Sequence, residues 1–171
     1  KKTLMGMRVF SLQHPKTRHF LNEWTFHQFL KNEGLIYLRY KFVHLYINND
    51  DLGVYALEEG FEKNLIENNK LRAGPILKFS EELFWESNYY NDFKDAYNDV
   101  YRYSTIESYQ ESKTLKDSLL KQQFIIGVSL LEKFRSGELT ASQVFDIDKL
   151  ATFLAVTDIL SGDHANAWNN K

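Results

Sequence analysis

Residues 37–57 of the chain, YLRYKFVHLYINNDDLGVYAL, decide its fold. Tyr37 to Ile47 is rich in Tyr, Val, Ile and Phe, which favours a β-strand because branched and aromatic side chains pack well on a pleated surface. The run Asn48-Asn49-Asp50-Asp51 has the composition of a tight turn, and Val54 to Leu57 supplies a returning strand. Gly53 lies at the junction, where a bulge or a positive φ is expected. This stretch therefore predicts a β-hairpin.

A strand and a helix are predicted before the hairpin. Arg8 to Gln13 has the composition of a short strand, and His14-Pro15-Lys16 is typical of a turn. Apolar residues recur at helical spacing from Arg18 to Glu33, with Thr17 as the expected N-cap and Gly34 as the stop. We expect this helix to pack on the hairpin around Asn48 to Gly53.

The part of the chain after the hairpin is predicted to be mostly helical. The elements are a short helix at 61–69, a short strand at 75–79, short helices and loops at 80–109, a long helix at 115–134 and a last helix capped by Asp146. Strands thus dominate the first half and helices the second. That segregation predicts an α+β fold rather than alternating βαβ units, with the two long C-terminal helices forming a second lobe.

The composition excludes several classes of function. The 171 residues include 21 basic and 23 acidic side chains, for a net charge of -2, so the chain has no basic field for a phosphate backbone and nucleic acid is not an expected partner. Charges interrupt every apolar stretch before the ~20 residues that a membrane span needs. The absence of Cys excludes disulfides, thiolate metal sites and thiol nucleophiles.

Four stretches, in this order along the chain, resemble one protein family. They are FSLQHPKTR at 10–18 with Glu23-Trp24 after it, YIN and GVY of the hairpin with Glu58-Glu59 after it, GPILKF at 74–79, and DIDKLA at 146–151 leading to DHANAWNN at 163–170. Their order and spacing resemble the CotH family, which is named for spore coat protein H and is related to protein kinases. The resemblance implies an atypical protein-kinase-like fold, with a small-lobe-like part at about 1–80 and a helical lobe at about 81–171. The family pattern begins earlier and continues later, so residues 1–171 are expected to be a fragment of one such domain, truncated at both ends.

The resemblance also implies roles for residues of a phosphotransfer site that uses ATP with Mg²⁺ or Mn²⁺. Kinases need a carboxylate that orients the attacking hydroxyl and an Asn that binds metal a few residues later, and Asp163 and Asn170 fit these roles. Lys78 is the candidate cation for the phosphates, with Glu59 as the carboxylate that orients it. One departure is Asn169, because many relatives have His at this position, so the local hydrogen bonding must differ.

Several of these side chains have a second interpretation from the residues themselves. Lys78 could instead be an edge-strand Lys that discourages aggregation. Arg18 lies near a helix N-terminus, where the partial positive charge of the helix dipole disfavours a cation unless an anion is close. Its position therefore indicates either a phosphate contact or a structural pair with Glu23. Asp158 could anchor the loop that follows the last helix, or be a solvated helix residue.

The leading hypothesis for function is an atypical protein kinase that transfers the γ-phosphoryl group of ATP to Ser or Thr of a protein substrate. The later acidic metal ligand of the family pattern would lie beyond Lys171, so the fragment itself is expected to be inactive. The alternative is a non-catalytic kinase-like module of a spore coat or cell-surface assembly, and these locations are suggested by the resemblance only. A glycan-binding or glycan-processing domain ranks last, because it rests on aromatic and acidic residues alone.

Overall fold

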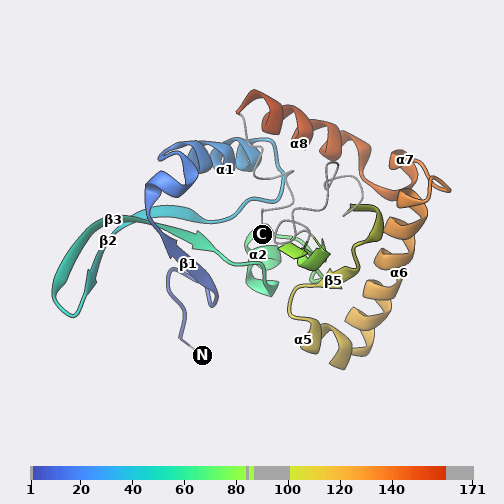
Figure 1. Cartoon of the computed structure of the whole chain (residues 1–171), viewed down its shortest axis with the longest axis horizontal. Helices are drawn as coiled ribbons and strands as arrows, with labels where there is room; N and C mark the ends of the chain where they lie inside the picture. Colours follow the sequence, from blue (N-terminus) through green and yellow to red (C-terminus); the bar gives the residue numbers. More distant parts are fainter. Residues whose placement is uncertain (1, 84, 87–100, 161–171) are drawn as a thin grey trace. The chain divides into compact units, whose positions relative to one another are not determined.

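The computed structural model of the chain describes residues 2–83, 85, 86 and 101–160. These residues form two units, which are coloured along the sequence in Figure 1. Residues up to 73 and from 148 onward belong to the first unit, and residues 74–147 belong to the second. Antiparallel strands dominate the first half of the chain and helices the second, so the predicted α+β class is confirmed. None of the helices in the described part of the chain is long and apolar enough to cross a membrane.

The first unit is built on a three-stranded antiparallel sheet in the order β1-β3-β2. Its strands are β1 (Phe10–Gln13), β2 (Tyr40–Ile47) and β3 (Asp50–Glu59). The turn between β2 and β3 places Asn48 and Asn49 at φ 51° and 70°, left-handed conformations that Asn tolerates. The predicted hairpin is confirmed, and so is the irregularity at Gly53, which has φ 78° and lies where the register of the two strands shifts.

The predicted helix starts later than its sequence pattern suggested. Pro15–Arg18 forms a separate 3-10 turn, η1, whose N-cap is His14, and α1 follows only at Asn22–Asn32. His19 separates the two, because its φ of 50° is incompatible with a continuous helix. Thr17 is therefore not the cap of the long helix, and its hydroxyl donates instead to the backbone carbonyl of His14 at 2.7 Å.

The base of the hairpin, and not its tip, contacts α1. The His27 ring lies 6.0 Å from the Tyr40 ring, and His27 Nδ1 accepts a hydrogen bond from the backbone N–H of Leu38 at 3.3 Å. At the tip, the side chains of Tyr46 and Ile47 are exposed. The prediction that the hairpin around Asn48 to Gly53 packs on the helix was therefore wrong for the tip.

The core of the first unit joins α1 to the last helix, α8 (Ile147–Ile159). Phe26 and Leu30 of α1 are buried together with Val156 of α8. The ring of Phe153 stands edge-on to that of Phe26 at 6.2 Å. Helix α8 thus packs with α1 in the first unit, and the predicted division into two lobes near residue 80 stays a prediction.

The described residues of the second unit include a two-stranded antiparallel sheet and several helices. The strands are β4 (Leu77–Phe79) and β5 (Ile106–Ser108), and the helices are α5 (Glu111–Lys116), α6 (Ser118–Arg135) and α7 (Ala141–Val144). Strand β5 lies in the stretch where only short helices and loops were expected.

The long helix predicted at 115–134 is divided at Asp117. The backbone of Asp117 is extended, and its carboxylate accepts hydrogen bonds at 3.0 Å from the backbone N–H groups of Leu119 and Leu120. Asp117 therefore ends α5 and caps α6, a role that Asp performs well because it satisfies N–H groups with no partner inside the helix.

Candidate functional site

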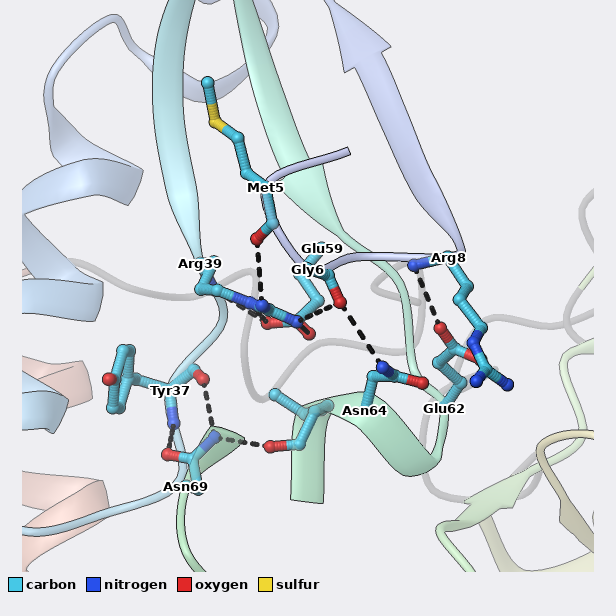
Figure 2. Close-up of polar contacts among 10 residues, drawn as sticks. Met5, Gly6, Arg8, Tyr37, Arg39, Glu59, Glu62, Asn64 and Asn69 are labelled. Atoms are coloured by element: carbon cyan, nitrogen blue, oxygen red, sulfur yellow. Dashed lines mark hydrogen bonds and ion pairs between the residues drawn. The ribbon is translucent and has the colours of Figure 1, made fainter. Parts of the chain in front are cut away.

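Glu59, the last residue of β3, lies in a buried ion pair with Arg39 (Figure 2). Its side chain is 1% exposed. Glu59 Oε2 accepts from the backbone N–H of Arg39 at 3.1 Å and from Arg39 Nε at 3.0 Å, while Oε1 accepts from Arg39 Nη2. A carboxylate taken out of water this completely needs such a partner, and a two-pronged Arg contact also sets its orientation.

Arg39 also binds the N-terminal segment. Its Nη1 donates to the carbonyl of Met5 at 3.0 Å, and its Nη2 donates to the carbonyl of Gly6 at 3.4 Å. The hydrogen bond to Glu59 raises the pKa of Arg39 above its ordinary value. Sequence reasoning missed Arg39, although a lone Arg between Leu38 and Tyr40 in a strongly apolar run signals a charge that needs a partner.

The start of helix α2 (Lys63–Asn68) joins the same network. Asn64 Nδ2 donates to the carbonyl of Gly6 at 3.3 Å, and Glu62 Oε1 accepts from the backbone N–H of Arg8 at 3.2 Å. Figure 2 shows these contacts gathered around the end of β3. Arg39 is therefore the centre of a polar network that connects Glu59 of β3 to the N-terminal segment, and Asn64 of α2 joins it through the carbonyl of Gly6.

Lys78 lies in the middle of β4 and is paired with Glu107 of β5. The two residues face each other across the strands, with Lys78 Nζ 3.3 Å from Glu107 Oε2. The Lys78 ammonium also lies 5.6 Å from the centre of the Tyr109 ring. Both charged side chains remain about one-third exposed, so this pair contributes little to stability and leaves Lys78 accessible to an anion.

The predicted pairing of Lys78 with Glu59 joins residues of two different units and stays a prediction. Each has an ion-pair partner inside its own unit, Glu107 for Lys78 and Arg39 for Glu59. The prediction failed to include Glu107 because a three-residue strand carries too little periodicity to be recognised in sequence.

Arg18, the last residue of η1, acts on Glu58 of β3. Burial raises the pKa of Glu58 above its ordinary value, and the charge of Glu23 adds to that rise. The charges of Arg18 and His27 and the hydrogen bond from Gln13 Nε2 lower it in part. The carboxylate of Glu58 is thus one anion near Arg18, and the predicted phosphate contact or pair with Glu23 stays a prediction.

The half-buried Glu58 predicts a particular dependence of stability on pH. Because the pKa of Glu58 is raised on folding, the folded state binds the carboxyl proton of Glu58 more tightly than the unfolded state does. The free energy of unfolding therefore falls as pH rises from the ordinary Glu pKa through the raised one. Gln does not titrate, so the stability of wild type relative to Glu58→Gln should decline as pH rises from the ordinary Glu pKa of about 4. Urea unfolding across this range measures it, and a difference that stays constant with pH would contradict the prediction.

The first unit also contains an apolar cavity of about 580 Å³ between η1 and the hairpin. Phe20, Phe42 and Val54 contribute to its walls, with His14 at one side. The residues that line it include no Lys or Arg, so this cavity offers no cation for a phosphate group.

The predicted catalytic residue Asp163 and the predicted metal ligand Asn170 both lie outside the described residues. Within the described part of the chain, no group of three or more His, Asp or Glu side chains is arranged to hold a metal ion. Asp158 is exposed on α8, and the loop that it was predicted to anchor lies outside the described residues.

Comparison with known protein families identifies the family of the chain. The family described as CotH kinase protein matches residues 1–164, a range that includes Lys78 and Asp163 and ends before Asn170. Comparisons with curated proteins and with solved structures gave no match. Because the family match covers nearly all of the 171 residues, the chain belongs to the CotH kinase protein family.

Proposed function

We propose that the protein is an atypical protein kinase that transfers the γ-phosphoryl group of ATP to Ser or Thr hydroxyls of a protein substrate. The observation that carries this proposal is the family match over residues 1–164. Phosphoryl transfer asks a protein chiefly for positioning and charge stabilisation, so a small set of polar side chains is sufficient.

Lys78 is the proposed contact to the phosphates. Its ammonium is partly exposed, and Glu107 and Tyr109 restrict it from two sides, so it is held in place without being enclosed. Asp163 is the proposed carboxylate that orients the substrate hydroxyl and accepts its proton as the oxygen attacks the γ-phosphorus. Glu59 and Arg18 are also proposed to lie near the bound nucleotide.

Asn170 is the proposed metal ligand. When bound, Mg²⁺ or Mn²⁺ would neutralise the charge that develops on the phosphate oxygens. The proposal of a metal ion rests on family membership, because no cluster of His, Asp or Glu side chains among the described residues could hold one.

Two observations favour the alternative of a non-catalytic kinase-like module, for example in a spore coat or cell-surface assembly. The carboxylate of Glu59 accepts three hydrogen bonds from Arg39, which gives it a structural task independent of any nucleotide. Asn169 also stands where many CotH relatives have His. Under this alternative the protein binds no ATP, so nucleotide binding separates the two functions.

We expect Lys78→Ala to weaken ATP binding by the full-length natural protein at least ~10-fold, which corresponds to about 1.4 kcal/mol. Alanine removes the positively charged ammonium group that is proposed to contact the phosphates of ATP. Isothermal titration calorimetry with Mg²⁺-ATP and with Mn²⁺-ATP measures the effect.

The matched control is Lys63→Ala, which removes an exposed Lys paired with Glu67 on α2 and should leave ATP affinity unchanged. Equal affinities for Lys78→Ala and wild type would assign the cation role to another residue. No ATP binding by the wild type would favour the non-catalytic module.

A further inference from the structure

The N-terminal segment forms a tight turn that is fastened to Arg39. Leu4 and Met7 exchange backbone hydrogen bonds at 2.9 Å, and Met5 and Gly6 between them have φ values of 50° and 80°. The side chain of Met7 is 1% exposed, so it fixes one end of the turn in the interior. The carbonyls of Met5 and Gly6 both accept hydrogen bonds from the Arg39 guanidinium.

Arg39 is therefore shared between this turn and the Glu59 carboxylate. A carboxylate has about four acceptor positions, and Arg39 fills three of those of Glu59 with its backbone N–H, Nε and Nη2. The same Nη2 reaches Gly6 O, while Nη1 reaches Met5 O. A guanidinium is planar and rigid, so a movement of the turn that displaces its Nη atoms also displaces the atoms that hold Glu59.

We propose that Arg39 is the positioning residue of Glu59 and that the Leu4–Met7 turn is a latch that holds Arg39 in place. With the latch closed, as in this structure, the Glu59 carboxylate is buried and has one orientation. With the latch open, Arg39 loses its carbonyl contacts and Glu59 becomes accessible to solvent. The consequence for phosphoryl transfer rests on the proposed function, whereas the latch itself does not.

Gly6 is the position from which the latch can be opened without changing Arg39 or Glu59. A Cβ at Gly6 would lie 2.5 Å from Arg39 Nη1, closer than two such atoms can approach. The end of an Arg side chain would normally move aside, but here it is bound to Glu59 on one side and to the turn on the other. The φ of 80° adds backbone strain for Ala.

Gly53 provides a matched control in the same unit. Its φ of 78° imposes nearly the same backbone strain on Ala, and no atom lies within 4 Å of a Cβ placed there. The difference between Gly6→Ala and Gly53→Ala therefore reports the clash with Arg39 rather than the strain of a left-handed Ala.

The experiment is carboxyl footprinting of the 171-residue chain with a water-soluble carbodiimide and glycine ethyl ester, read by peptide mass spectrometry. In the wild type, Glu59 should be labelled far more slowly than the exposed Glu67, whose side chain is 51% exposed. In Gly6→Ala we expect labelling of Glu59 to rise on the order of tenfold with Glu67 unchanged, because local opening sets the access of reagent to a buried group. Gly53→Ala should leave the labelling of both residues as in the wild type.

Asn64→Ala is a milder second variant in case Gly6→Ala fails to fold. It removes the hydrogen bond that holds Gly6 from the side of α2 and should raise labelling of Glu59 by about fivefold, the effect of one hydrogen bond. The proposal is overturned if Glu59 stays protected in both latch variants, or if Gly53→Ala exposes it as much as Gly6→Ala does. ATP plays no part in this experiment, so its failure is separate from a failure of Lys78→Ala to change nucleotide affinity.

Discussion

Arg39→Met is expected to lower the free energy of unfolding by about 3 to 5 kcal/mol. The substitution leaves the Glu59 carboxylate, 1% exposed, with no cation and without the side-chain hydrogen bonds that Arg39 supplies. An uncompensated buried charge costs more than the ion pair contributes, which is why removing one partner is so destabilising. Urea denaturation followed by tryptophan fluorescence measures the change.

Two further variants test the cause of this loss. Lys63→Met breaks an exposed pair with Glu67 at 2.9 Å and should cost no more than about 0.5 kcal/mol. The double variant Arg39→Met with Glu59→Leu removes both charges, so it should recover most of the stability that Arg39→Met loses. If the double variant is as unstable as the single one, the contribution of Arg39 comes from its contacts with the N-terminal turn and not from Glu59.

Asp163→Asn is expected to lower kcat for phosphoryl transfer by about 100-fold to 10,000-fold in the full-length natural protein. Asn keeps the size of the side chain and its ability to accept a hydrogen bond, but it cannot take the proton of the attacking hydroxyl. The loss should therefore appear in kcat with little change in the KM for ATP. Initial rates of phosphate transfer from labelled ATP to a protein substrate measure both constants.

Asp148→Asn, the same chemical change at an exposed position of α8, is the matched control and should keep wild-type rates. Full activity of Asp163→Asn would place the catalytic loop elsewhere, and Asp158 would be the next residue to test. A rise in KM without a fall in kcat would indicate that Asp163 binds substrate and does not accept its proton.

Local signals in the sequence were sufficient for the elements whose conformation is decided by neighbouring residues. The hairpin was predicted from its β-branched and aromatic content and from Asn48 and Asn49, which adopt the left-handed backbone that such turns need. Gly53 was located for the same reason. The α+β class followed from the order of the elements, and the CotH resemblance from short stretches that keep their order along the chain.

Features that depend on distant residues could not be predicted in this way. Arg39 and Glu59 are twenty positions apart, and nothing in either local sequence identifies the other as its partner. The break at Asp117 was missed because the apolar spacing continues across it and because Asp suits a helix N-cap as well as an exposed helix position. Strand β5 is recognisable only through its pairing with β4.

The packing of α1 against α8 also sets the order in which the first unit completes its core. Phe26 and Leu30 lie near the start of the chain and Val156 near its end, with the whole second unit between them in sequence. Contacts that close so long a loop carry a large entropic cost and slow the search for the native state. During synthesis α1 and the hairpin emerge before α8, so the apolar face of α1 stays uncovered until α8 follows. The first unit therefore cannot complete its core until α8 has formed.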